Sequence, residues 1–214
     1  ANIQTAVSGI ILAKMRNGGA ACTSANRIFV QKGIAEEFLA AFTKAMDAFV
    51  MGRGTDQGVT LGAYVSLKER DKIAALVDEA IKSGASVRTG GKKPDGPGAF
   101  YPATVMTVDK YNSILKHEIF GPVAPIVIFD TDEEGITLAN DTEFGLISYV
   151  FSGELGRAIR TAEAMESGMV AINKGVISDP AAPFGGVKQS GLGREGGFDG
   201  IHEFLETKYI GFDL

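Results

Sequence analysis

Apolar side chains recur every three or four residues in several stretches of the chain, and this spacing predicts amphipathic helices. The first covers residues 3–16 and ends at the pair Gly18-Gly19, which favours a helix stop. Ser66 is placed as the N-cap of a later helix, which Gly84 ends. The helices predicted after the first cover residues 34–49, 66–83, 132–140, 154–166 and, as a short helix, 198–205.

Short apolar and β-branched runs separate these helices and predict strands. The run 123–129 is nearly all apolar, as expected of a strand buried on both faces of a parallel sheet. The other predicted strands cover residues 27–31, 86–89, 101–108, 146–151 and 169–173. Because helices and strands alternate, we predict an α/β fold of three layers, with a mostly parallel open sheet between helices on both faces.

Two stretches fall outside this alternation. Residues 174–197 are rich in glycine and too long for a simple connector, and loops of this kind are commonly functional. At the end of the chain, the apolar residues Ile210, Phe212 and Leu214 alternate with smaller or polar ones. This alternation predicts an edge strand within residues 206–214, and an edge strand with an apolar face tends to associate with another chain.

Composition and charge narrow the classes of function. Hydrophobic residues make up 45% of the 214 residues and charged residues 22%, which are ordinary globular values. The net charge of −5 argues against nucleic acid as a partner. No apolar run approaches the ~18 residues of a membrane span and no secretory signal opens the chain, so we expect a cytoplasmic protein without a membrane partner. One cysteine and two distant histidines give no metal-ligand spacing, so we predict no metal site.

The single cysteine, Cys22, is the first candidate for chemistry. Two glycines and two alanines precede it, so nearby backbone N–H groups are free to point at a ligand beside the sulfur. Arg16 and Arg27 flank it, and nearby positive charge lowers the pKa of a thiol and favours the nucleophilic thiolate. On the local sequence alone, a small buried core residue is an equally good interpretation.

Three further features of the sequence could contribute to chemistry. A cysteine hydrolase would pair the sulfur with a histidine base, and the chain offers His117 and His202, each better interpreted as a surface or hydrogen-bonding residue. The segment Gly191–Gly196 matches G-x-G-x-x-G, but it follows a Pro/Gly loop instead of a strand, so we reject it as a dinucleotide site. Glu118 shortly precedes the buried strand, which places it at the mouth of the sheet, where α/β proteins bind ligands.

Three segments, taken in order, resemble a known family. The cysteine segment 16–27 is followed by His-Glu-Ile-Phe-Gly-Pro-Val at 117–123 and by Pro-Phe-Gly-Gly-Val-Lys-Gln-Ser-Gly-Leu-Gly-Arg-Glu at 183–195. Together they resemble the catalytic half of the aldehyde dehydrogenase superfamily over the whole chain, and the tail is most similar to succinate-semialdehyde dehydrogenases. Ala20 departs from the pattern, because many members carry glutamine there. The change should alter loop packing more than chemistry, since the sulfur and its own N–H are retained.

The resemblance implies a role for each candidate residue. Cys22 would be the catalytic nucleophile, which attacks the aldehyde carbon and then carries the acyl group as a thioester. Glu118 would hydrogen-bond the nicotinamide ribose of NAD or NADP, and Phe120 would pack near the nicotinamide ring. Arg16 and Ser178 match an arginine and a serine that hold the substrate carboxylate in the succinate-semialdehyde members, and a guanidinium suits bidentate carboxylate binding.

The resemblance also implies that residues 1–214 are a single catalytic domain excised from a longer chain. In the family, most of the cofactor-binding half, an oxyanion-holding amide and the water-activating glutamate lie before this segment. We therefore expect an NAD(P)-dependent enzyme whose substrate is a small aldehyde, succinate semialdehyde, and expect this segment alone to be inactive. Residues 206–214 would join a sister subunit in a homodimer or homotetramer. The alternatives are a cysteine hydrolase or thioesterase-like enzyme and a non-catalytic oligomerising module.

Overall fold

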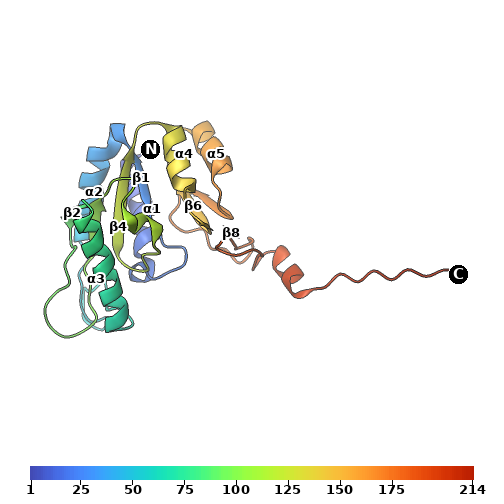
Figure 1. Cartoon of the computed structure of the whole chain (residues 1–214), viewed down its shortest axis with the longest axis horizontal. Coiled ribbons are helices and arrows are strands. Elements are labelled where there is room, and N and C mark those ends of the chain that lie inside the picture. Colours follow the sequence, from blue (N-terminus) through green and yellow to red (C-terminus); the bar gives the residue numbers. More distant parts are fainter.

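Four strands form the central sheet of the chain, which a computed structural model describes over residues 1–214 (Figure 1). Their order is β1-β4-β3-β2, and β4 pairs in parallel with both β1 and β3, whereas β2 is antiparallel to β3. This arrangement confirms the predicted α/β class with a mostly parallel sheet. The strands are β1 (Ile28–Gln31), β2 (Ser86–Thr89), β3 (Thr104–Thr107) and β4 (Val123–Phe129).

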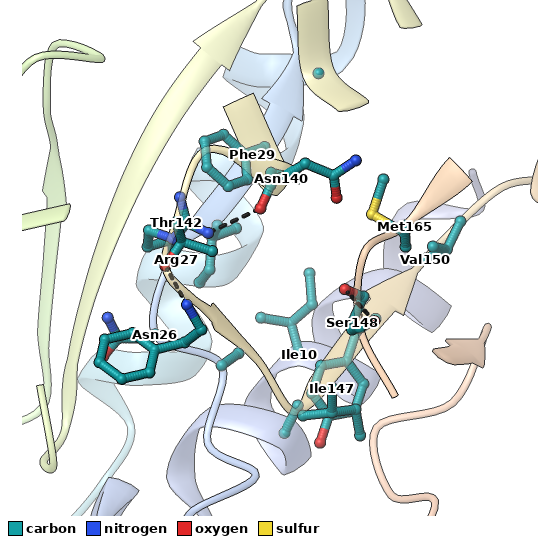
Figure 2. A pocket seen from close by; sticks show the side chains of 18 of the residues that line it. Ile10, Asn26, Arg27, Phe29, Asn140, Thr142, Ile147, Ser148, Val150 and Met165 are labelled. Atoms are coloured by element: carbon teal, nitrogen blue, oxygen red, sulfur yellow. Dashed lines mark hydrogen bonds between the residues drawn. The ribbon is translucent and has the colours of Figure 1, made fainter. Parts of the chain in front are cut away.

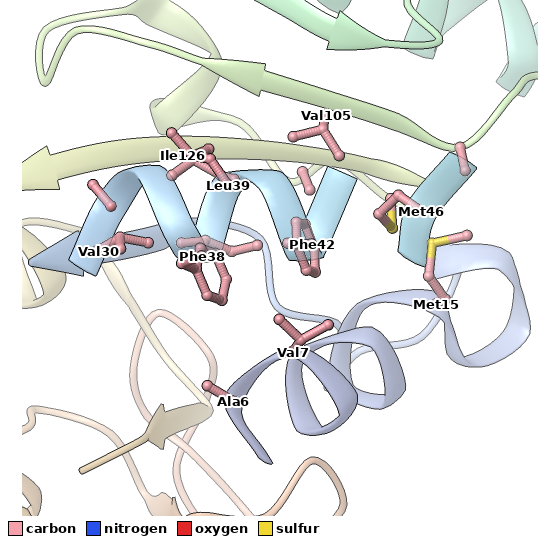
Figure 3. Close-up of a cluster of buried hydrophobic side chains, with 14 of the residues drawn as sticks. Ala6, Val7, Met15, Val30, Phe38, Leu39, Phe42, Met46, Val105 and Ile126 are labelled. Atoms are coloured by element: carbon pink, nitrogen blue, oxygen red, sulfur yellow. The ribbon is translucent and has the colours of Figure 1, made fainter. Parts of the chain in front are cut away.

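Helices cover both faces of this sheet, as the sequence predicts. On one face, α1 (Ile3–Met15) and α2 (Ala35–Asp47) enclose a buried cluster in which Phe38 and Phe42 of α2 stack with ring centroids 5.3 Å apart (Figure 3). On the other face, α3 (Leu67–Lys82) packs with the short 3-10 helix η3 (Ser113–Lys116) in a second cluster. The central strand β4 contributes side chains to both clusters, which explains its nearly all-apolar sequence.

Local signals at the helix ends act as predicted. The Ser66 hydroxyl accepts a hydrogen bond from the Glu69 N–H at 3.2 Å, so it caps α3. At the other end of α3, Gly84 has φ +94°, a left-handed conformation that glycine adopts without strain. A 3-10 turn, η2 (Lys32–Ile34), precedes α2, which begins at Ala35, and α2 ends at Asp47, before the predicted end at residue 49.

The remaining strands do not join the central sheet, which corrects the expectation of one continuous sheet. β6 (Ile147–Val150) pairs in parallel only with β7 (Met169–Ile172), and these strands lie beside α4 and α5 (Figure 1). The two-residue strands β5 (Phe144–Gly145) and β8 (Val187–Lys188) form a separate antiparallel pair. The helices of this part are α4 (Asp132–Asn140) and α5 (Leu155–Ala164).

The end of the chain leaves the body of the molecule (Figure 1). A 3-10 helix, η4 (Asp199–Phe204), stands where a short helix was predicted. Residues 205–214 are exposed and contain no helix or paired strand, so the strand expected at 206–214 is absent from the single chain. A strand needs a partner to hydrogen-bond, so its role in an oligomer stays a prediction.

No helix in the structure combines the length and the apolar character that membrane crossing requires.

Candidate active site

Cys22 lies in the turn between the 3-10 helix η1 (Arg16–Gly19) and β1, and its side chain is exposed. The exposure excludes the interpretation of Cys22 as a buried core residue. The preceding backbone is tightly wound, since Asn17, Gly18 and Gly19 have φ of 52°, 62° and 81°. Two of these three residues are glycines, which tolerate the left-handed region, so the glycine pair allows the chain to leave α1 and present the sulfur.

Glycines also bring the cysteine turn against the segment that contains Glu118. A Cβ atom at Gly19 would collide with the carbonyl oxygen of Gly121, and one at Gly121 would collide with the Tyr64 hydroxyl. Only residues without a side chain permit this close approach. Both glycines stand in motifs that the sequence analysis singled out. The sequence did not indicate which atoms each glycine approaches.

Hydrogen bonds hold the residues after Cys22 in place. The Ser24 hydroxyl donates to the Lys14 carbonyl at 3.1 Å, which ties the turn to the end of α1. On the other side, the Tyr149 hydroxyl donates to the Thr23 carbonyl at 2.9 Å. Burial raises the pKa of Tyr149, and the nearby Cys22 raises it further. The hydrogen bond to Thr23 and the charge of Arg16 lower this pKa by less, so it stays above its usual value. Tyr149 therefore remains a protonated donor at neutral pH.

The side chain of Asn26 connects the cysteine turn to the Glu118 segment. Its Nδ2 donates to the His117 carbonyl at 2.6 Å, and its Oδ1 accepts from the Ile119 N–H at 2.6 Å. The two partners are the residues on either side of Glu118. Sequence reasoning missed this contact, since nothing near Asn26 indicates a partner more than ninety residues away.

Beside the cysteine lies a cavity of about 700 Å³, whose lining includes Cys22, Glu118 and Phe120. Figure 2 shows other residues of the lining, among them Asn26, Arg27 and Ser148. Every residue of 27–31 and of 144–152 lines it. A sheet face would contribute alternate residues, so the unbroken runs indicate that the edges of β1 and β6 face the cavity. Each of these strands has only one neighbour, β4 for β1 and β7 for β6.

The structure thus brings three of the five predicted site residues to one cavity. Glu118 is exposed there without a hydrogen-bond partner, and Phe120 is 43% exposed. Arg16 is exposed at the start of η1 but does not line the cavity. Ser178 lies exposed in the loop after β7, also outside the lining.

Arg27, which the sequence placed beside the sulfur, directs its guanidinium elsewhere. It donates to the carbonyls of Leu138, Ala139 and Asp141 at 3.1, 2.8 and 3.2 Å, which are the unpaired groups at the end of α4. The guanidinium also lies 5.4 Å from the centroid of the Phe29 ring. A cation at a helix C-terminus is favourable, so Arg27 anchors α4 and its donors are not available to the Cys22 sulfur.

Neither histidine is hydrogen-bonded to Cys22. His117 lines the cavity with Cys22, but no hydrogen bond joins them. The hydrogen bonds of His117 are made by its backbone, which accepts from Asn26 and donates to Ile114. His202 lies in η4 with an exposed side chain, outside the cavity lining. The cysteine hydrolase interpretation requires a base within hydrogen-bond reach of the sulfur, and the structure does not support it.

Lys14 is the unexpected charged group near the site. Its side chain is fully buried, with no hydrogen-bond partner for Nζ. Burial lowers the pKa of Lys14 from 10.5 to about 7. A signal was present in the sequence, because Lys14 continues the apolar spacing of the first helix toward the core.

The chain belongs to the aldehyde dehydrogenase family, whose model matches residues 1–210. It is 51% identical over 212 residues to a succinate-semialdehyde dehydrogenase of Paenarthrobacter nicotinovorans, covering 99% of this chain and 47% of the relative. A glutarate-semialdehyde dehydrogenase of Pseudomonas putida is 43% identical over 210 residues, covering 98% and 44%. A solved succinate-semialdehyde dehydrogenase from Burkholderia pseudomallei superposes with a TM-score of 0.92 at 44% identity, covering 95% of this chain and 42% of that one. The chain therefore spans less than half the length of these relatives.

Proposed function

We propose that the chain is the catalytic domain of an NAD(P)-dependent aldehyde dehydrogenase that oxidises a small aldehyde with a distal carboxylate, succinate semialdehyde. The observation that carries the proposal is the exposed Cys22 on one cavity with Glu118 and Phe120. Family membership and the named activities of the relatives support the reaction class. The alternative of a non-catalytic module does not account for an exposed nucleophile on a cavity with two further motif residues.

The chemistry of this domain centres on the sulfur. The Cys22 thiolate attacks the aldehyde carbon, and the C=O π electrons move to oxygen, which leaves an oxyanion that the Cys22 backbone N–H can hold. Loss of hydride from this adduct gives a thioester, and hydrolysis by water releases the carboxylic acid and restores the thiol. When bound, NAD or NADP supplies the hydride acceptor.

The exposed groups of the cavity fit a nicotinamide nucleotide. The Glu118 carboxylate has no partner of its own, so it can accept hydrogen bonds from two ribose hydroxyls. The partly exposed ring of Phe120 offers an apolar face to a planar heterocycle. Both residues belong to one short segment, which would place the sugar and the ring of the cofactor next to each other.

The open strand edges support a longer protein, in which residues 1–214 form one domain. β1 and β6 each leave one edge unpaired, and both edges face the same cavity. Adjacent strands lie about 4.8 Å apart, so one inserted strand would satisfy both edges and join β6 and β7 to the central sheet. We propose that this strand comes from the part of the protein that the longer relatives possess and this chain does not.

The assembly and location of the protein are further parts of the proposal. The exposed tail carries Ile210, Phe212 and Leu214, and we propose that it adds a strand to a sister subunit in a homodimer or homotetramer. Sedimentation equilibrium of the complete protein with and without residues 206–214 tests this, and an unchanged mass would refute it.

A cytoplasmic location stays a prediction, and relatives from rice and mouse are named as mitochondrial.

The substrate carboxylate is assigned to Arg16 and Ser178. Succinate and glutarate semialdehydes, named for the relatives, both carry a carboxylate distant from the aldehyde. Arg16 lies six residues before the nucleophile, and its charge acts on Tyr149 beside the cysteine turn. Its exposure leaves its donors available to a ligand.

Arg16→Ala in the complete protein tests the function and the substrate class together. A charge-assisted hydrogen bond contributes about 1.5–3 kcal/mol, so kcat/KM for succinate semialdehyde should fall about 10- to 150-fold. Butanal gains nothing from a guanidinium and should lose far less. Arg53→Ala, at an exposed loop position, is the matched control and should change neither substrate. Equal losses on both aldehydes would show that Arg16 is structural, and NAD(P)H formation that survives Cys22→Ser would refute the mechanism.

A further inference from the structure

We propose that Asn26 is a positioning residue, which places Glu118 relative to Cys22 and thereby sets the affinity for the nicotinamide cofactor. The inference rests on the proposed function, because it takes Glu118 as a cofactor contact. Its basis in the structure is the paired hydrogen bond of the Asn26 amide across Glu118, to the His117 carbonyl and the Ile119 N–H, both at 2.6 Å.

The geometry restrains Glu118 from both sides. One hydrogen bond orients the peptide group before Glu118 and the other orients the peptide group after it. The Glu118 carboxylate itself is exposed, with no hydrogen bond or ion pair to hold it. Its position is therefore determined by its backbone, and the Asn26 amide is the side chain that fixes that backbone.

The connection from Asn26 to the nucleophile is short and firmly held. Asn26 is four residues after Cys22, and the residues between them are bound by Tyr149 at Thr23 and by Ser24 to the end of α1. An amide supplies one donor and one acceptor at the required separation. An ionised carboxylate has no donor, and a hydroxyl is too short to contact both backbone groups. A displacement of Glu118 would misplace the ribose while leaving the sulfur where it is. The expected consequence is a change in cofactor binding that exceeds any change in the chemical step.

Asn173 provides a matched control elsewhere in the fold. Its amide makes the same kind of paired contact, donating to the Ser152 carbonyl at 2.9 Å and accepting from the Ser152 N–H at 3.0 Å, in the loop after β6. Asn173 does not line the cavity, and its φ of 52° makes glycine the replacement that adds no backbone strain. Asn173→Gly therefore removes a comparable clamp that has no hydrogen bond to the Glu118 segment.

The experiment compares Asn26→Ala, Asn26→Ser and Asn173→Gly in the complete protein. We expect all three variants to lower Tm, but only the Asn26 variants to raise KM for NAD(P), about tenfold, with kcat changed less than threefold. Tenfold corresponds to about 1.4 kcal/mol, the scale of one hydrogen bond to a charged group. Asn26→Ser keeps part of the side-chain volume, so KM can be determined on this variant if Asn26→Ala does not fold.

Two further readouts separate the possible failures. Hydrogen exchange at the Ile119 amide should accelerate in the Asn26 variants and stay unchanged in Asn173→Gly. An active wild type whose cofactor KM and Kd are unaffected by the Asn26 variants would overturn the positioning role while leaving the proposed function intact. A wild type that binds NAD(P)H but oxidises no aldehyde would refute the proposed function, and the Kd of the Asn26 variants would still decide the inference. A wild type that binds no nicotinamide nucleotide would overturn both.

Discussion

Replacing Lys14 by methionine should stabilise the 214-residue chain, and the gain should depend on pH. The Lys14 side chain is fully buried and its Nζ has no hydrogen-bond partner. Methionine has a similar length and no charge, and a volume-conserving replacement in a core usually costs less than about 1.5 kcal/mol. The dominant change is therefore the removal of a buried amine, which is unfavourable in either protonation state.

The size of the effect follows from the lysine pKa. Burial lowers it from 10.5 to about 7, and each tenfold change in a proton affinity corresponds to about 1.4 kcal/mol. Charged Lys14 thus destabilises the folded chain by about 5 kcal/mol at and below pH 6. Between about pH 7 and 10.5 the unfolded chain binds more protons at this residue than the folded chain, so the penalty shrinks as the pH rises. At pH 9 about 2 kcal/mol remains.

Urea unfolding of wild type and Lys14→Met at pH 6, 7, 8 and 9, followed by circular dichroism, measures this. The stability advantage of the variant should fall by about 3 kcal/mol from pH 6 to pH 9. Lys44→Met is the control, since Lys44 is exposed on α2 without an ion pair, and its difference from wild type should not depend on pH. A Lys14→Met difference that is constant over this range, or a variant less stable than wild type at pH 6, would refute the reasoning.

Two other substitutions test how the cysteine turn is held. Gly19→Ala should lower the free energy of unfolding by more than about 2 kcal/mol, because it adds a collision with the Gly121 carbonyl to the cost of a left-handed alanine. Gly58→Ala, with φ +82° and open space around it, should cost only about 1–2 kcal/mol, and equal losses at both glycines would contradict the close approach. Tyr149→Phe should cost about 1 kcal/mol in urea unfolding, since the Thr23 carbonyl loses its donor, and an unchanged midpoint would show that water replaces it.

The sequence predicted most of the helices and strands and three of the residues that line the cavity. Helical periodicity, the Ser66 cap and the apolar run 123–129 depend on neighbours in the sequence, so they could be read before any contact was known. The motif residues Cys22 and Glu118 could be singled out in the same way. Their common cavity follows from the crossover topology, since β1 and β4 are parallel neighbours and both motifs lie next to these strands.

Only the tertiary structure decided which distant groups meet. The guanidinium of Arg27 donates to the carbonyls at the end of α4 because the packing of α4 brings them within hydrogen-bond distance. The sequence around Arg27 does not indicate this contact. In the same way, the hydrogen-bond partners of Asn26 are more than ninety residues away in the sequence. Lys14 is buried, and its Nζ has no hydrogen-bond partner. The pattern along a chain records which side of an element is buried, because that depends on residues three or four positions apart. The identity of a polar group's partner depends on how whole elements pack, so it is determined only when the chain has folded.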